Sequence, residues 1–331
     1  MSIDVHAHCI PSELMDVLTA DGADFGIELT DDRRAVIAGG TPTMPIRDDL
    51  IDLDARLEAM DRAGIEVQVL SSWVNLTAYG LDAKKGEFWS RRVNEALAVE
   101  AERSPDRFLA MATVPLQEPE LAVAELQNAT SELGMVGVEI ATTVNGTDLV
   151  SADLETFWSA AAALGSLVLL HPMEPLPGID LKKHFLDNMI GRPAETTIAI
   201  ARLFMAGVFD RHPGLRMCVV HGGGFLPYQI GRVQRGWEAK PDTAGADLAT
   251  PPMTAIKQLY FDTILHHPAA LRYLIDLLGA DRIMIGTDYP FEAGDLDPLT
   301  TIDAIPNLTN EERSLIVSGT AHAVLNTGGT P

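Results

Sequence analysis

The sequence contains few cysteines, no long hydrophobic run and few basic residues relative to acidic ones. Two cysteines in 331 residues do not make the disulfide framework of a secreted protein. Cys9 and Cys218 are therefore expected to be small buried hydrophobic residues. No stretch reaches the roughly 18 consecutive apolar residues of a membrane span. Strand-forming residues begin at Ile3, which leaves no room for a signal peptide. We expect a cytoplasmic protein that binds no membrane.

The shortage of basic residues limits what the protein can bind. There are 24 Lys and Arg against 47 Asp and Glu, which gives a net charge of -23 at pH 7. Nucleic-acid binding is excluded because it depends on Lys and Arg to neutralise phosphates. An anionic small molecule would also be repelled unless a few arginines are placed at its site. Individual arginines near a site are therefore informative.

Alternation of strand-like and helix-like segments dominates the rest of the chain. Eight short apolar runs recur, each followed by a longer amphipathic stretch, and several of these stretches end at a glycine, as helices often do. The runs are IDVHAH (3–8), VQVLSS (67–72), LAMATVP (109–115), GVEIAT (137–142), LVLLHP (167–172), RMCVVHG (216–222), QLYFDT (258–263) and RIMIGTD (282–288). Apolar strands that alternate with helices indicate a parallel sheet, and eight repeats predict a closed (β/α)8 barrel, the TIM-barrel fold.

Three connections depart from this regular pattern. Residues 9–50 are far longer than an ordinary strand-to-helix loop and are rich in Asp, Gly, Thr and Pro. We interpret them as a small insertion after the first strand that lies over the barrel mouth. A second irregular stretch, 172–192, follows the fifth strand, and a third spans residues 239–257. The whole chain, 1–331, is predicted to be one barrel domain that carries the 9–50 insertion.

Polar side chains end four of the eight predicted strands. His6 and His8 end the first, His171 the fifth, His221 the sixth and Asp288 the eighth. In a strand, residues two apart point to the same side, so His6 and His8 can converge on one point, although this pair alone could be two packed core histidines. Active sites of such barrels lie at the carboxyl ends of the strands. Three histidines and one carboxylate with room for a water match an open catalytic zinc site.

The motifs around these residues resemble a known family. "DVHAHCIP", "LLHP", "VVHGGGFLPYQIGR" and "IMIGTDYPF" resemble the amidohydrolase superfamily, and within it the metal-dependent decarboxylases typified by aminocarboxymuconate-semialdehyde decarboxylase. The resemblance implies that His6, His8, His171 and Asp288 bind one divalent metal ion, zinc being favoured and manganese the alternative. It also implies that His221 is the catalytic acid/base, acting on the metal-bound water or on the substrate beside the catalytic Asp288.

The resemblance also suggests residues that bind the substrate. Arg47 matches the family's arginine in the insertion after a short gap, and Phe291 belongs to the "GTDYPF" motif. Arg232, in "IGR", matches an arginine that the family uses across a homodimer, so a homodimer is expected. His184 stands where the family has a tryptophan. Glu174 differs from the family as well, and these differences bear on the substrate rather than on the metal chemistry.

Glu139 on the fourth strand leaves a choice between one and two metal ions. Binuclear relatives in the superfamily use a lysine or glutamate there as a bridge, whereas the close relatives have glutamine. We therefore favour a single metal ion.

The predicted function is the non-oxidative decarboxylation of a small unsaturated or aromatic carboxylic acid, of the aminocarboxymuconate-semialdehyde or hydroxybenzoate type. No organic cofactor is expected because "HGGG" lacks the G-x-G-x-x-G spacing of a dinucleotide site. A metal-dependent hydrolase or hydratase of a small carboxylated substrate is the main alternative. A non-catalytic metal-binding barrel is a third interpretation, which would need a broken ligand set.

Overall fold

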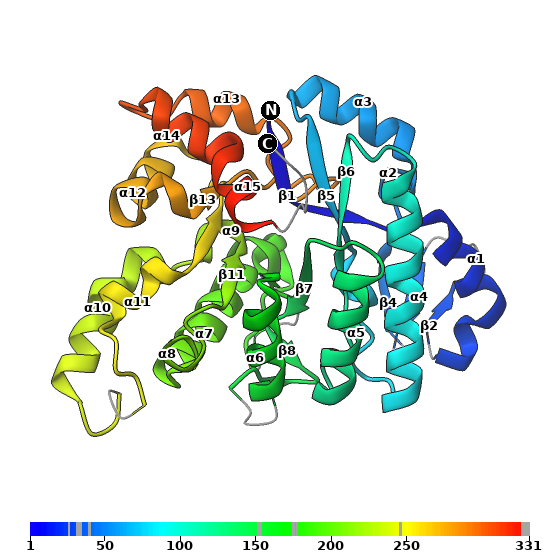
Figure 1. Cartoon of the computed structure of the whole chain (residues 1–331), viewed down its shortest axis with the longest axis horizontal. Helices are drawn as coiled ribbons and strands as arrows, with labels where there is room; N and C mark the ends of the chain where they lie inside the picture. The colour runs from blue at the N-terminus through cyan, green and yellow to red at the C-terminus, as the bar shows by residue number, and fades with distance from the viewer. Residues whose placement is uncertain are drawn as a thin grey trace.

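The computed structural model describes residues 1–25, 27–30, 35–38, 41–150, 154–173, 176, 178–244 and 247–325. Figure 1 shows strands in the middle of the molecule with helices around them. All eight predicted strands are present and form one parallel sheet. In sheet order they are β1 (Ile3–Cys9), β5 (Val67–Ser72), β6 (Phe108–Ala112), β7 (Gly137–Ala141), β10 (Leu167–His171), β11 (Arg216–Val219), β12 (Tyr260–Asp262) and β13 (Ile283–Met284).

The sheet closes between its first and last strands. The Val5 amide donates to the Ile285 carbonyl at 2.9 Å, and the His8 amide donates to the Tyr289 carbonyl at 2.8 Å. Parallel bridges pair Asp4 with Ile285 and Ala7 with Tyr289. The predicted (β/α)8 barrel is therefore confirmed. Its closure brings the segment that carries Asp288 beside the strand that carries His6 and His8.

Helices cover the outside of the barrel, because apolar residues of the strands and helices pack into one outer core cluster. Helices follow each barrel strand in turn, as Figure 1 shows along the colour gradient. The longer ones are α3 (Leu53–Ala63), α4 (Ala83–Glu102), α5 (Pro119–Ser131), α6 (Glu155–Leu164), α7 (Arg192–Met205), α10 (Leu226–Ala239) and α12 (Pro268–Leu278). Shorter segments after β13 are α13 (Pro298–Asp303), α14 (Asn310–Ser314) and α15 (Thr320–Val324).

A second, smaller apolar cluster lies inside the barrel, and it shows how the strands aim their side chains. On β10, Leu167 and Leu169 belong to this inner cluster, whereas Val168 and Leu170 belong to the outer one. Because side chains alternate along a strand, His171 continues the inward series. The position of His171 at the open end of the barrel therefore follows directly from strand alternation.

On β1 the alternation changes partway along the strand. Ile3 and Val5 belong to the inner cluster, so simple alternation would turn His6 and His8 outward. Both histidines nevertheless face the inside of the barrel. The pairing with β5 is irregular between Asp4 and Ala7, where β1 has one residue more than its partner. An extra residue of this kind re-aims the side chains that follow it. This irregularity turns both histidines toward His171.

The insertion after β1 contains α1 (Ser12–Asp21) and a small antiparallel sheet of β2 (Ile27–Leu29), β3 (Ala35–Ala38) and β4 (Thr41–Pro45). Helix α1 packs beside α4 (Figure 1), and Ser12 donates to the carboxylate of Glu100 from its amide at 2.8 Å and its hydroxyl at 2.6 Å. Residues 26, 31–34 and 39–40 lie outside the described residues, so the predicted cover over the barrel mouth stays a prediction.

Both cysteines are buried and free, as expected from the sequence. Across the described ranges, every helix is too short or too polar to cross a membrane.

Candidate metal centre and substrate cavity

Three side chains from the two ends of the chain meet at the carboxyl end of the barrel. The Nε2 atoms of His6 and His8 lie 3.2 Å apart. Asp288 Oδ1 lies 3.6 Å from the Nε2 atom of His6 and 3.2 Å from that of His8. All three residues are buried. Donors about 2.1 Å from a common ion at tetrahedral angles would be about 3.4 Å apart. The observed separations therefore suit a shared cation.

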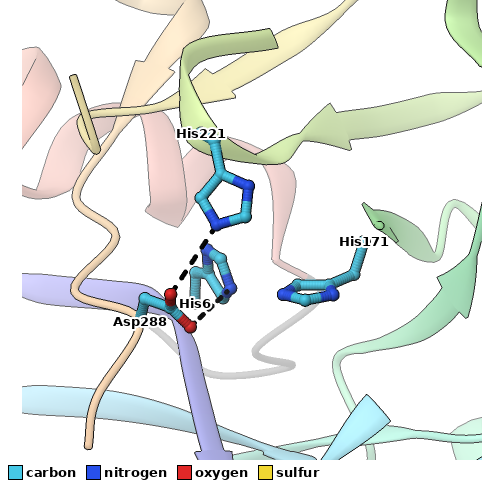
Figure 2. Close-up of side chains that lie close together, drawn as sticks. All are labelled: His6, His171, His221 and Asp288. Atoms are coloured by element: carbon cyan, nitrogen blue, oxygen red, sulfur yellow. Dashed lines mark ion pairs between the residues drawn. The ribbon is translucent and has the colours of Figure 1, made fainter. Parts of the chain in front are cut away.

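His171 and His221 complete the ring of donors, and Figure 2 shows both directed toward the space beside Asp288 and His6. The ligand atoms of His6, His171, His221 and Asp288 lie within 4.8 Å of one another. Neither ring nitrogen of buried His171 has a hydrogen-bonding partner in the described part of the chain, and the same holds for Asp288 Oδ1. Such unpaired buried groups are costly unless a ligand satisfies them. The donor set therefore fits a divalent metal ion.

Asp262, at the end of β12, holds two of these histidines in place. Its Oδ2 accepts from His6 Nδ1 at 2.8 Å and from the His221 amide at 2.9 Å, while its Oδ1 accepts from the Gly222 amide at 2.8 Å. The contact with His6 fixes the proton on Nδ1 and leaves the Nε2 lone pair directed at the centre. Asp262 therefore positions a candidate ligand and the candidate acid/base together.

The backbone after β11 turns sharply to present His221. His221 has φ 55° and Gly222 has φ 59°, in the left-handed region. A Cβ on Gly222 would lie 2.5 Å from Leu265 Cδ2, and one on Gly223 would lie 2.5 Å from Phe261 Cε1. Only glycine fits such positions without displacing its neighbours. The first two glycines of "HGGG" thus suit the tight turn that carries His221.

The electrostatics of the cluster favour a positive charge at its centre. Burial opposes protonation of His6, but the hydrogen bond with Asp262 and the charge of Asp288 raise its pKa to about 9. Burial opposes ionisation of Asp288 as well, but His221 and His8 hold its pKa well below the usual range. Burial, together with the neighbouring His8 and His6, lowers the pKa of His171 well below its usual value. A neutral His171 can donate a lone pair to a metal.

Glu139 lies on the other side of His8. Its Oε2 is 3.8 Å from His8 Nδ1, and the ligand atoms of His8, Glu139 and His171 also lie within 4.8 Å of one another. Neither Glu139 oxygen has a hydrogen-bonding partner among the described residues, and burial raises the pKa of the group. Glu139 therefore reaches the edge of the centre, and the single metal ion stays a prediction.

A cavity of about 350 Å³ opens onto the cluster. His171, His221 and Asp288 line its floor, and two of the predicted substrate-binding residues, Arg47 and Phe291, line its wall. The Phe291 ring lies 5.5 Å from the ring of His8, centre to centre. This volume suits a small molecule such as a monocyclic acid.

The other predicted substrate-binding residues do not line this cavity. His184 is exposed, and its neighbour Phe185 lines the cavity instead. Arg232 is exposed on α10, so a role for it at this site depends on a second chain. Glu174 lies outside the described residues.

Two residues that the sequence interpretation did not single out belong to the site, Asp262 and Arg192. Asp262 ends the seventh barrel strand, in the same position as the candidate ligands of the other strands, so its place in "YFDT" could have identified it. Arg192 begins α7 and lines the cavity. In the sequence, Arg192 could have been noticed because it is the last residue of the irregular stretch 172–192 that follows the fifth strand.

The comparisons with known proteins agree with this architecture. The amidohydrolase family model matches residues 3–327. Over 324 residues the chain is 29% identical to 2-amino-3-carboxymuconate-6-semialdehyde decarboxylase of Dictyostelium discoideum, which covers 97% of this chain and 90% of that protein. It is 35% identical over 264 residues to gamma-resorcylate decarboxylase of Rhizobium radiobacter, which covers 73% of this chain and 78% of that protein.

A solved structure gives the same result in three dimensions. The dihydroxybenzoic acid decarboxylase of Polaromonas sp. JS666, with bound manganese and the inhibitor 2-nitroresorcinol, superposes with a TM-score of 0.82 at 26% identity. The match covers 99% of this chain and 98% of that chain. The family model spans nearly the whole sequence, and the fold and the arrangement of the site agree with it. The chain therefore belongs to the amidohydrolase family.

Proposed function

We propose that the protein is a metal-dependent, non-oxidative decarboxylase of a small aromatic or unsaturated carboxylic acid. The observation that carries the proposal is a cluster of buried donors, His6, His8, His171 and Asp288, beside a cavity that His171, Asp288 and an additional histidine, His221, line. The relatives matched over most of the chain are decarboxylases of carboxymuconate and resorcylate type. The similarity to these relatives favours decarboxylation over hydrolysis.

His6, His8, His171 and Asp288 would hold one divalent metal ion, and we propose zinc. Three imidazoles and one carboxylate are a common zinc ligand set, while the related Polaromonas structure contains manganese. When bound, the metal supplies Lewis-acid stabilisation of negative charge on an oxygen atom beside the reacting carbon. Asp262 keeps the Nδ1 proton on His6, so that the ring is held in one tautomer.

His221 would deliver the proton that makes loss of CO2 possible. Breaking the bond to the carboxylate leaves its electron pair on the ring or alkene carbon. Protonating that carbon first makes it tetrahedral, so the electron pair of the breaking bond returns to the π system and CO2 leaves. The His221 Nε2 atom lies 3.7 Å from Asp288 Oδ2 and faces the cavity. A positioned imidazole of this kind contributes about 10²–10⁴-fold to the rate.

The active form would be a homodimer in which Arg232 holds the substrate carboxylate of the neighbouring chain. Arg232 is exposed on α10 and does not line its own cavity. Phe225 and Tyr228, near the start of the same helix, are large apolar side chains that are 39% and 78% exposed. An exposed apolar face of this kind favours an interface between protein chains. A cytoplasmic location also stays a prediction.

The proposed function is tested by CO2 release from metal-loaded protein. A panel of hydroxybenzoates, aminobenzoates and carboxymuconate-type acids should contain at least one acid that is decarboxylated. Chelated protein should lose that activity and regain it when Zn²⁺ or Mn²⁺ is added. No CO2 from any acid, together with hydrolysis of an amide or lactone, would favour the hydrolase instead.

A further inference from the structure

The side chain of Arg192, which has no role in the proposed reaction, lies at the cavity. Arg192 lines the same cavity as His171, His221 and Asp288. Its guanidinium makes no hydrogen bond in the described part of the chain, and Nη1 is buried without such a partner. In a chain with a net charge of -23, an arginine placed at a cavity wall calls for an explanation.

A buried carboxylate, that of Glu195, lies near the guanidinium of Arg192. The arginine Nη1 lies 3.5 Å from Glu195 Oε2, which is longer than a hydrogen bond. Glu195 is itself fixed, because its Oε1 accepts from the Met173 amide at 3.0 Å and from the Thr142 hydroxyl. The side chain of Glu195 is 6% exposed and that of Arg192 is 31% exposed. Glu195 therefore places a negative charge near one edge of the guanidinium, and the guanidinium nitrogens make no hydrogen bond to the residues that the structure describes.

The backbone before Arg192 brings it over the cavity. Residues Asp187–Gly191 form a π-helical turn, in which the Arg192 amide bonds to the Asp187 carbonyl. Because π-helical bonds join residues five apart, Arg192 lies about one turn above Asp187, and both line the cavity. Such turns often occur at functional sites. The irregular turn is thus part of what aims Arg192.

Arg47, the other arginine at the cavity, is already bonded to carboxylates of the protein itself. Its Nε and Nη2 bond to the two oxygens of Asp49 at 3.0 and 2.8 Å, and its Nη1 bonds to Glu292 at 3.3 Å. Each of its nitrogens therefore has a carboxylate partner. Of the two arginines, Arg192 has more capacity to bind a ligand, since its one ion pair among the described residues is the looser contact with Glu195.

We propose that Arg192 is a specificity-determining residue that binds a second anionic group of the substrate, distinct from the carboxylate that is lost as CO2. This inference rests on the proposed function for the reaction, but it makes a claim about binding alone. A guanidinium forms paired, charge-assisted hydrogen bonds to a carboxylate. The favoured ligands are therefore small dicarboxylates rather than monocarboxylates of the same ring size.

Equilibrium binding tests this inference without any turnover. Benzoate and the three benzenedicarboxylate isomers would be titrated calorimetrically into the metal-loaded protein, the isomers scanning the separation of the two charges. At least one isomer should bind more tightly than benzoate. Arg192→Gln should weaken that isomer by about tenfold to a hundredfold while leaving benzoate nearly unchanged. Arg192→Lys should keep part of the preference because it keeps the charge.

Arg202→Gln is the matched control, since Arg202 lies on the same helix, is 53% exposed and pairs with Asp148 instead. Equal affinities of wild type for benzoate and all three isomers would overturn the inference, whether or not the variants fold. A preference that survives in Arg192→Gln would overturn it as well. A preference that depends on Arg192, in a protein that decarboxylates none of the acids tested, would support this inference while the proposed function fails.

Discussion

The Nδ1 atom of His6 lies 2.8 Å from Oδ2 of Asp262, and these two residues are 256 positions apart in the sequence. The same carboxylate oxygen accepts the backbone amide of His221 at 2.9 Å. One buried carboxylate therefore fixes the tautomer of a proposed metal ligand and the backbone that presents the proposed acid/base. Disturbing Asp262 should affect both functions without removing either side chain.

Asp262→Asn should lower metal affinity by about 10–100-fold, the usual effect of losing a group that orients a metal ligand. The amide can place an N–H where the carboxylate accepted two hydrogen bonds. Metal affinity would be measured by competition with a chelator of known affinity. The control is Glu125→Gln. It alters a buried carboxylate that accepts a hydrogen bond from Asn94, and both residues are far in sequence from the proposed ligands. Equal metal affinity in Asp262→Asn and wild type would contradict the positioning role.

Changing His6 and His8 together to alanine should remove the metal and keep the fold. Two of the four proposed ligands are lost, and their Nε2 atoms lie 3.2 Å apart at the centre of the site. Elemental analysis would measure the metal per chain, and circular dichroism would check the fold. His322→Ala changes an exposed histidine in α15 and should keep a full complement. Full metal content in the double variant would refute the ligand assignment.

His221→Ala should keep the metal but lose about 10²–10⁴-fold in turnover. His221 lies beside Asp288 in a turn with φ 55°, and the four proposed ligands would complete the coordination without it. Turnover and metal content would be measured on the same preparation. Loss of the metal would make His221 a ligand, and an unchanged rate would remove it from the mechanism.

Mixing an Arg232→Ala chain with a His221→Ala chain should restore activity that neither has alone. If Arg232 acts across a homodimer, a mixed dimer has one site that lacks both groups and one site that lacks neither. Random exchange makes half of the dimers mixed, so activity should recover to about a quarter of wild type. Native mass spectrometry would confirm the exchange. Exchange without any recovery would show that Arg232 does not act on the partner's site.

Glu312→Gln should destabilise the protein in a pH-dependent way. Glu312 bonds to Arg272 at 2.8 and 3.2 Å and caps α14 with Thr309. Its hydrogen bond with Arg272 lowers the pKa from 4.5 to about 2. A carboxyl group whose pKa is lower in the folded state stabilises the fold at pH values above its unfolded pKa of 4.5. This contribution is lost as the pH falls toward about 2.

At pH 7 the variant should lose about 1 kcal/mol of unfolding free energy. The difference from wild type should shrink as pH falls from about 5 to about 2. Urea denaturation at several pH values measures this difference. The neighbouring exposed Glu311→Gln is the control, and a difference independent of pH would contradict the assigned linkage.

Much of the fold and the donor set was predictable from the sequence. The eight apolar runs specified the eight strands, because strand alternation and burial are local properties of the chain. The polar residues that end those runs were expected to meet, because the carboxyl ends of barrel strands share one face. His6, His8, His171, His221 and Asp288 do meet there.

Other features depended on contacts between distant segments. The irregular pairing of β1 that turns His6 and His8 inward is set by its partner strand. The partnership of His6 with Asp262 is made by closing the barrel. His184, expected near the substrate, is exposed, whereas Arg192 lines the cavity through the π-helical turn before it. By itself the sequence determined which residue types stand at the ends of the strands, since this follows from local periodicity. Only the tertiary structure decided which of their neighbours hold them and which arginine is left with a weakly paired guanidinium, because those contacts join segments far apart in the chain.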